Sequence, residues 1–192
     1  MRKLETALCA SLLVIAGCTP KGTPAVAASP ANPAAAAVVA VPETFLTATA
    51  TIMDAQGKRV GNATFTDSYA GVLVDGTVSD LGLGSHGVHI HAIGKCEPPF
   101  TTAGGHFNPT TRQHGFQNQH GPHLGDLPNI NTPGAGTLHF EFVLPNVTLK
   151  GQNALLDADG AAIVIHAGRD DYKTDPAGSS GGRIACGVIT QQ

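Results

Sequence analysis

Several features of other protein classes are missing from this 192-residue sequence. The 11 lysine and arginine residues are outnumbered by 14 aspartate and glutamate residues and form no basic stripe, which disfavours nucleic-acid binding. No stretch has a sustained helical period, so a helical fold is not expected. No repeat or second folded domain is visible. The apolar stretch at residues 7–16 is too short to cross a bilayer as a helix.

Residues 1–18 have the pattern of a targeting segment. Arg2 and Lys3 precede the apolar stretch, which ends in VIAGC. This ending resembles the lipobox of bacterial lipoproteins, where cleavage precedes the cysteine, here Cys18, and that cysteine is acylated. Thr19 resembles the residue found in lipoproteins sorted to an outer membrane. We therefore expect an exported protein, periplasmic or anchored at the outer membrane by this lipid alone; the alternative is an ordinary secretory signal.

The next segment, residues 19–42, consists of Ala, Pro, Thr, Ser and Val with few other residues and one charge, Lys21. It has no periodicity and nothing large to bury, which predicts a disordered tether. The remaining residues, 43–192, are sufficient for one domain with a genuine core.

Short β-rich segments bounded by Gly, Pro or Asp recur through this domain. In LHFEFVL, for example, Leu138, Phe140 and Phe142 share one strand face, whereas His139 and Glu141 share the other. The segments expected to form strands are 46–53, 61–67, 71–82, 85–93, 138–149 and 161–167. Such a series predicts an antiparallel sandwich or barrel.

Histidines are concentrated between residues 85 and 126, which hold seven of the nine in the chain. His89 and His91 lie two apart in an apolar, β-branched run, so both rings face the same side of a strand. The alternative is a polar surface loop with one or two satisfied core histidines. A core cannot hold this many unpaired imidazoles, and metal binding explains the density better.

The tract that follows is rich in Gly, Pro, Asn and Gln, which predicts a loop without a packed core. Three imidazoles and a carboxylate within it match a tetrahedral zinc set. These residues are His106, His114, His123 and Asp126. His120 competes with His123 as the third imidazole.

Five segments resemble the signature segments of copper–zinc superoxide dismutase, in the order found in that family: HGVHIHAIGKC, GGHFNP, HLGDLPN, HAGRDD and GGRIACGVI. The resemblance covers residues 44–192. It implies an all-β fold, a Greek-key β-barrel or sandwich with long metal-binding loops. It also implies disproportionation of superoxide to dioxygen and hydrogen peroxide by copper that alternates between Cu(II) and Cu(I). This activity would protect the cell envelope.

The resemblance assigns ligands to both metals. Copper is expected on His89, His91, His106 and His166, and zinc on His106, His114, His123 and Asp126. These sets suit tetragonal Cu(II) and tetrahedral Zn(II). His106 belongs to both sets, so its imidazole would bridge the two ions.

Further roles follow from the same resemblance. Arg183 is expected beside the copper, where it attracts the anion and contributes to catalysis together with His106. Asp170 is expected to connect a copper ligand to a zinc ligand, His91 to His114. His86 is expected to be a structural hydrogen-bonder.

Several residues lack such an assignment. His120 and His139 match nothing in the family and are expected to be solvent-exposed. Lys95, Arg169 and Lys173 are further basic residues that are candidates for attracting the substrate anion together with Arg183.

The cysteines fit an exported protein. Cys9 lies in the targeting segment and Cys18 at its end, which leaves Cys96 and Cys186 as a pair expected to form one disulfide. In the family this bond joins the loop that carries the first cysteine to the last strand. The alternative is two free buried thiols.

Two other functions are weighed against the enzyme. One is a non-catalytic periplasmic module that binds copper or zinc on the same fold, and the other is a copper-only relative. The intact ligand sets and Arg183 favour the enzyme. The sequence leaves open whether the protein is a monomer or a homodimer.

Overall fold

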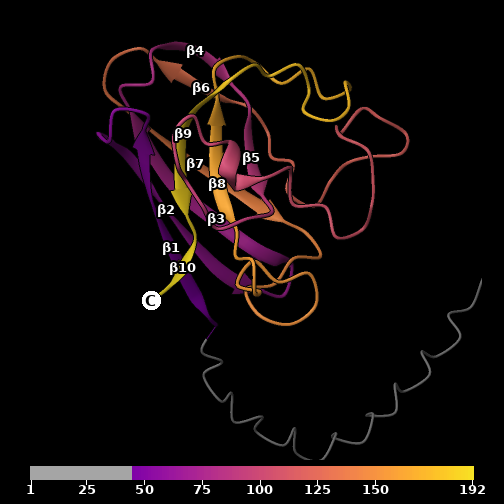
Figure 1. Cartoon of the computed structure of the whole chain (residues 1–192). Helices are drawn as coiled ribbons and strands as arrows, with labels where there is room; N and C mark the ends of the chain where they lie inside the picture. The colour runs from indigo at the N-terminus through magenta and orange to yellow at the C-terminus, as the bar shows by residue number, and fades with distance from the viewer. Residues whose placement is uncertain (1–44) are drawn as a thin grey trace, which may run out of the picture. The chain divides into compact units, whose positions relative to one another are not determined.

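The computed structural model describes residues 45–192, which form an almost entirely β structure (Figure 1). The predictions for residues 1–18, for Cys18 and for residues 19–42 lie outside the described part. Between residues 45 and 192 there is no helix that could cross a membrane. The elements are β1 Thr47–Asp54, β2 Arg59–Ser68, β3 Gly71–Ser79, β4 Leu83–His86, β5 Val88–His91, the 3-10 turn η1 Thr101–Ala103, β6 Ile130–Pro133, β7 Thr137–Leu144, β8 Ala162–His166, β9 Arg183–Val188 and β10 Thr190–Gln191.

The main sheet is antiparallel and curls on itself, with the strand order β5-β8-β9-β1-β2-β3-β7 (Figure 1). β10 pairs with β1, and β4 and β6 form a separate two-stranded sheet. The chain passes from β3 to β5 at the opposite end of the sheet, returns to β7 beside β3, and crosses again to β8 beside β5. These crossing connections are of the Greek-key type. The predicted all-β fold is confirmed.

Alternating apolar residues build the core of this sheet. In β3, Val72, Val74 and Val78 are buried while Asp75 between them is exposed. β7 follows the face assignment expected from LHFEFVL, since Phe140 and Leu144 are buried and the residues between them are less so. The segments predicted at 46–53, 61–67, 71–82, 138–149 and 161–167 overlap the strands β1, β2, β3, β7 and β8, whereas the segment predicted as one strand at 85–93 is divided at Gly87 between the end of β4 and β5. β6 and β10 were not foreseen.

β5 and β8 differ from the other strands because they are buried on both faces. On one face Val88, Ile90 and Ile163 join the main core. On the other, Val164 packs against Phe100 of the β5–β6 loop in a second, smaller core. The histidines of β5 therefore lie under a loop, outside the main core.

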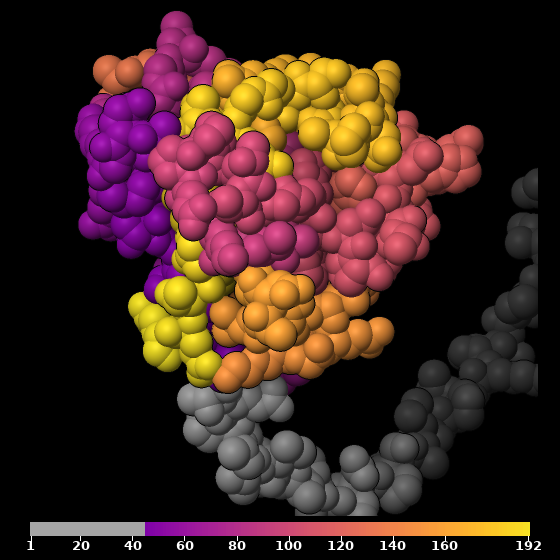
Figure 2. Space-filling view, viewed as in Figure 1, coloured from indigo at the N-terminus to yellow at the C-terminus, as the bar shows by residue number. Residues whose placement is uncertain are grey.

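Two long connections cover this outer face. The β5–β6 loop spans residues 92–129 and the β8–β9 loop spans residues 167–182. Figure 2 shows the two loops, in pink to salmon and in yellow-orange, side by side on one face of the molecule. Backbone hydrogen bonds join them directly, as from Gln117 N–H to the Tyr172 carbonyl at 2.9 Å. The histidines lie where these loops meet the strands.

Candidate metal centre

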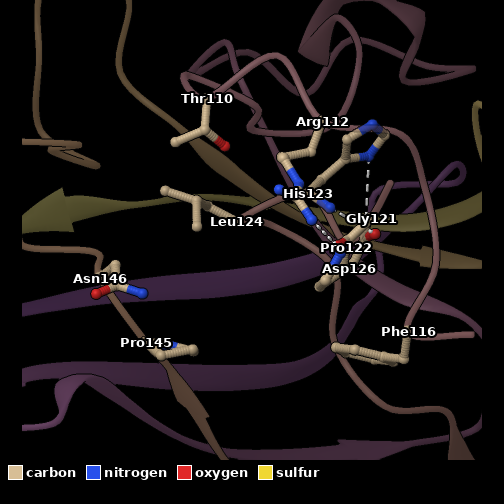
Figure 3. A pocket seen from close by; sticks show the side chains of 10 residues that line it. All are labelled: Thr110, Arg112, Phe116, Gly121, Pro122, His123, Leu124, Asp126, Pro145 and Asn146. Atoms are coloured by element: carbon tan, nitrogen blue, oxygen red, sulfur yellow. Dashed lines mark hydrogen bonds and ion pairs between the residues drawn. The ribbon is translucent and has the colours of Figure 1, made fainter. Parts of the chain in front are cut away.

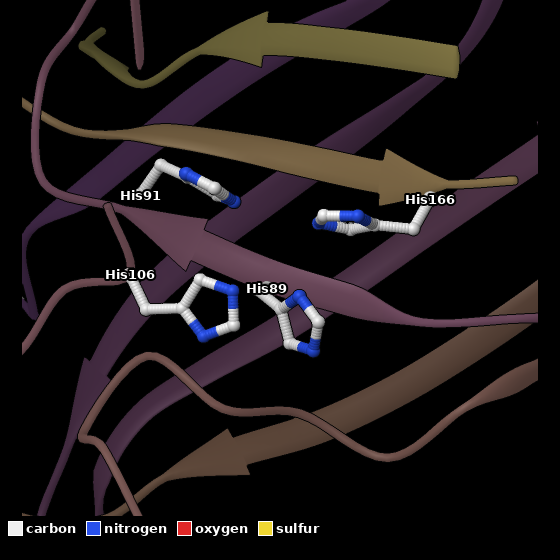
Figure 4. A group of neighbouring side chains, drawn as sticks. All are labelled: His89, His91, His106 and His166. Atoms are coloured by element: carbon white, nitrogen blue, oxygen red, sulfur yellow. The ribbon is translucent and has the colours of Figure 1, made fainter. Parts of the chain in front are cut away.

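Four histidines converge at the end of the sheet where β5 and β8 pair. We call His89, His91, His106 and His166 the four-histidine group; one ring nitrogen from each lies within 4.8 Å of the others. Figure 4 shows the rings arriving from β5, from the end of β8 and from the β5–β6 loop. The two β5 rings share a face because they lie two residues apart in a strand, as the sequence predicted.

In each of these rings, one nitrogen forms a hydrogen bond and the other nitrogen has no hydrogen-bond partner. His91 Nδ1–H donates to the Gly104 carbonyl at 2.9 Å, and His166 Nδ1–H donates to the Gly181 carbonyl at 3.2 Å. His89 Nε2–H donates to Asp170 Oδ2 at 2.7 Å. Within residues 45–192, four of the five buried ring nitrogens without a hydrogen-bond partner belong to this group. They are His89 Nδ1, His91 Nε2, His106 Nε2 and His166 Nε2.

The free nitrogens carry lone pairs, because burial keeps the rings neutral. Burial lowers the pKa of His91 to about 2 and that of His166 to about 3. It also lowers the pKa of His106 to about 4, and it lowers the pKa of His89. Four neutral imidazoles with unshared nitrogens fit a transition metal such as copper, since metal ligands must be deprotonated.

A second set of ligand atoms surrounds one carboxylate oxygen. Asp126 Oδ1 lies 2.9 Å from His106 Nδ1, 3.1 Å from His114 Nδ1 and 3.2 Å from His123 Nδ1. The Nδ1 atoms of His106 and His123 are 3.3 Å apart. We call these four residues the aspartate group. Tetrahedral zinc with bonds of about 2.0–2.1 Å separates its ligand atoms by about 3.3 Å, which matches these spacings.

The charges of the aspartate group also fit a divalent cation. Burial would raise the pKa of Asp126, but hydrogen bonds from the three imidazoles and from the Gly115 amide hold it far below its usual range. Burial would lower the pKa of His114, whereas its hydrogen bonds to Asp126 and Asp170 raise it to about 9. A positive charge is therefore stabilised at this position, in contrast to the four-histidine group.

One ring nitrogen of His89 also lies within 4.8 Å of ligand atoms of His106, His114 and Asp126. However, His89 Nε2 is already bonded to Asp170, whereas His123 Nδ1 approaches both Asp126 and His106. The distances to Asp126 and His106 therefore favour His123. His120 is exposed and contacts its neighbour Gln119, so the structure places it outside the group.

The structure corrects the expected partner of Asp170. Its carboxylate accepts hydrogen bonds from His89 at 2.7 Å and from His114 at 3.0 Å, and not from His91. The reason lies in the strand: His91 Nδ1 is taken by the Gly104 carbonyl. Asp170 thus joins the two groups through a different ring than the sequence predicted.

Sequence reasoning missed the residues that hold Asp170 in place. The side-chain amide of Asn129 accepts from the Asp170 N–H at 2.8 Å and donates to the Asp170 carbonyl at 2.9 Å. Gly178 is required nearby, because a Cβ there would collide with the Asp170 carboxylate and His114 Nε2. Nothing in the sequence around these two residues reveals contacts that arise only when the loops meet.

Arg183 lies at the start of β9, on a cavity that reaches the four-histidine group. Its guanidinium donates to the Phe100 carbonyl at 2.5 Å and to the Gly104 carbonyl at 2.6 Å. The cavity measures about 400 Å³. Its walls include His91, His106, His166, Arg183, Asn108 and Pro176. A small anion entering here would meet the arginine and the rings together.

The aspartate group also has a cavity on its other side. About 330 Å³ of space is lined by His123 and Asp126, by the polar residues Thr110, Arg112 and Asn146, and by apolar residues (Figure 3). Figure 3 shows Pro145 and Asn146 facing the loop residues across it. His123 also lines the cavity that contains Arg183, so its side chain borders both cavities.

The structure also shows the surroundings of His86, His139 and the two cysteines. His86 Nδ1–H donates to the His166 carbonyl at 2.8 Å, which ties β4 to the end of β8. His139 is exposed and bonded to Asp75 on the neighbouring strand at 2.9 Å. The predicted disulfide between Cys96 and Cys186 is confirmed, with a Cα–Cα distance of 5.6 Å, so the alternative of free thiols is wrong.

Comparison with known sequences gives a consistent result. The profile of a family described as copper/zinc superoxide dismutase matches residues 59–189. A protein named superoxide dismutase [Cu-Zn] 1 from Aquifex aeolicus is 46% identical over 144 residues, covering 73% of this chain and 85% of the relative. Superoxide dismutase [Cu-Zn] from Caulobacter vibrioides is 44% identical over 147 residues, covering 74% and 84%.

Solved structures show the same likeness. A SOD-like protein from Bacillus subtilis aligns with a TM-score of 0.70 and 38% identity, covering 73% of this chain and 96% of that one. The Cu/Zn superoxide dismutase from Brucella abortus aligns with a TM-score of 0.62 and 27% identity, covering 74% and 99%.

Proposed function

The chain belongs to the copper/zinc superoxide dismutase family, and from this premise we propose that it disproportionates superoxide at a copper held by the four-histidine group and bridged through His106 to a zinc held by the aspartate group. The observation that supports this most strongly is the orientation of His106. Its Nδ1 lies 2.9 Å from Asp126, and its Nε2 is buried without a partner beside the other three rings. Two separate ligand sets therefore share one imidazole.

Copper bound in this position would supply one-electron redox chemistry, whereas zinc keeps a single oxidation state. The overall reaction consumes two superoxide anions and two protons and yields one dioxygen and one hydrogen peroxide. The residues of the chain supply positioning and charge. Arg183 offers a fixed cation at the cavity, and His106 Nε2 is the atom that would hold either copper or, when copper is not bound to it, a proton beside the substrate.

Asp170 fixes the relative position of the two ligand sets. In a neutral imidazole, a carboxylate that accepts from one ring nitrogen leaves the lone pair on the other nitrogen, which is then free to bind a metal. Asp170 contacts one ring nitrogen of His89 and one of His114, so it orients a ring from each ligand set. Asn129 in turn fixes Asp170 by two hydrogen bonds, so the β8–β9 loop fixes the position of the two ligand sets relative to each other.

Metal content and superoxide disproportionation of the purified protein test this proposal. We expect about one copper and one zinc per chain together with fast disproportionation. When a histidine of either group is replaced by alanine, His139→Ala is the matched control, because His139 is exposed and belongs to neither group. Two bound metals without activity would instead identify the non-catalytic metal-binding module considered from the sequence.

We place this activity in the cell envelope, with Cys18 as the lipid attachment site. The support is the pattern of residues 1–18 and a disulfide that is characteristic of oxidising compartments. Fractionation of cells that express the protein or Cys18→Ala is the test. The wild-type protein should be found in the membrane fraction of the envelope and the variant should leave it; recovery of both in the cytosol would contradict the proposal.

A further inference from the structure

The three imidazoles of the aspartate group each have a second nitrogen that points away from Asp126. A metal-binding histidine usually gives this nitrogen to a carboxylate, a carbonyl or water, which fixes the ring and its tautomer. His106 Nε2 faces the four-histidine group and His114 Nε2 is bonded to Asp170 at 3.0 Å. The carboxylate facing His123 Nε2 is that of Asp175, whose Oδ1 lies 3.9 Å away.

The same oxygen reaches a second residue of the group. Asp175 Oδ1 accepts the backbone N–H of His114 at 2.6 Å. Asp175 therefore contacts the main chain of one predicted ligand and faces the ring of another. A separation of 3.9 Å is in the ion-pair range and is longer than a direct hydrogen bond.

A turn in the β8–β9 loop presents this side chain. Asp171 accepts from the N–H groups of Lys173 and Thr174, and Gly178 N–H donates to the Thr174 carbonyl at 2.6 Å. These hydrogen bonds fix the turn on both sides of Asp175. The position of the carboxylate thus follows from the local hydrogen bonding of the loop.

We infer that Asp175 is a positioning residue for zinc in the aspartate group: it fixes the main chain at His114 and orients the ring of His123. The inference rests on the proposed zinc site. An asparagine at position 175 could accept the same N–H from His114 without carrying a charge, so Asp175→Asn tests the contact with His123 separately from the contact with the main chain.

The test compares Asp175→Asn and Asp175→Ala with Asp171→Asn, each measured for zinc and copper affinity by competition with chelators. Asp171→Asn is the matched control, because it removes a carboxylate charge from the same loop while asparagine keeps the Oδ1 that accepts from the Lys173 and Thr174 N–H groups, so the turn that presents Asp175 is retained. We expect Asp175→Asn to bind zinc roughly tenfold more weakly than the control, and Asp175→Ala to bind it more weakly still. Copper affinity should stay within about twofold of the control, since Asp175 contacts neither His89, His91 nor His166.

Two results would overturn the inference. Equal zinc affinity in Asp175→Asn and Asp171→Asn would show that the carboxylate does not act on the zinc ligands. Equal loss of zinc and copper affinity in Asp175→Asn would show that Asp175 merely holds the loop.

A His123→Ala variant separates this outcome from failure of the proposed function. If His123→Ala binds zinc as well as the wild-type protein, the zinc site itself is misassigned. If His123→Ala loses zinc while Asp175→Asn does not, only the role of Asp175 is wrong.

Discussion

The four-histidine group and the aspartate group share His106 but are built differently. Three of the four rings in the first group come from the paired strands β5 and β8, and their ligand nitrogens are neutral and unshared. The second group comes from the β5–β6 loop, where every Nδ1 already has a carboxylate to contact. Strands thus fix one set of ligands in advance, whereas the loop set depends on charge and on contacts with a second loop.

This difference predicts opposite electrostatic behaviour without metal. Burial dominates in the four-histidine group and lowers the pKa of each of its rings. In the aspartate group, the hydrogen bonds of His114 to Asp126 and to the neighbouring Asp170 outweigh burial and raise the pKa of His114. Without metal, the rings of the four-histidine group are therefore neutral, whereas a positive charge is stabilised on His114 beside the Asp126 carboxylate.

The largest effect should come from removing a ligand that belongs to one group only. His91→Ala should weaken copper binding more than about 100-fold and abolish activity, because a lost ligand costs more than the 10- to 100-fold of a lost supporting contact. His123→Ala should do the same to zinc affinity while leaving copper binding far less affected. Chelator competition with both metals measures this, and equal loss of both metals in either variant would remove the distinction between the groups.

A smaller effect on both groups is expected from Gly178→Ala. The added methyl group would displace the Asp170 carboxylate from His114, and Gly178 also has a positive φ of 63° that disfavours alanine. Because Asp170 contacts His89 as well, copper and zinc affinity should each fall by roughly 10- to 100-fold. Gly182→Ala is a suitable control, since a Cβ there meets no neighbour within 4 Å. Unchanged affinities in Gly178→Ala would show that Asp170 does not couple the groups.

Loss of the disulfide should affect stability first and the four-histidine group second. Cys96 and Cys186 are 90 residues apart, so replacing both with serine should lower the free energy of unfolding by about 2–5 kcal/mol. The same loop supplies the Gly104 carbonyl that accepts from His91 and Arg183, so copper affinity should fall more than zinc affinity. Denaturant unfolding and metal competition measure the two effects; a loss confined to zinc would contradict this reasoning.

The smallest effect is expected from Arg183→Lys. The guanidinium holds two carbonyls in fixed geometry, which an ammonium group cannot reproduce, although it keeps the charge. Activity should fall by roughly tenfold or less, and in both proteins it should decrease as salt rises, because a local cation attracts the substrate. Arg183→Ala should lose most of this salt dependence. A flat salt dependence in the wild-type protein would remove the steering role.

The sequence was most informative where a regular period links neighbouring residues. Alternation along β5 places His89 and His91 on one face, and alternation along β7 separates buried from exposed residues. The segments that resemble the enzyme family identified the residues of both groups, including His166, which lies far along the chain.

Contacts between loops could not be predicted in the same way. The partner of Asp170 was wrong because the choice between His89 and His91 depends on which ring the Gly104 carbonyl occupies. Asn129, Gly178 and Asp175 were not singled out from the sequence, because each contacts a residue far away along the chain: Asp170 for Asn129, and His114 for Gly178 and Asp175. β6 and β10 were missed because strands of four and two residues show little periodicity.

The most direct test of the shared imidazole is the affinity of His106→Ala for both metals, measured beside His91→Ala, His123→Ala and the exposed control His139→Ala. If His106 bridges the two groups, its removal should weaken both copper and zinc binding, whereas each of the other two ligand variants should mainly weaken one. His139→Ala should bind both metals as the wild-type protein does. Loss of only one metal from His106→Ala would contradict the bridge and leave two independent sites.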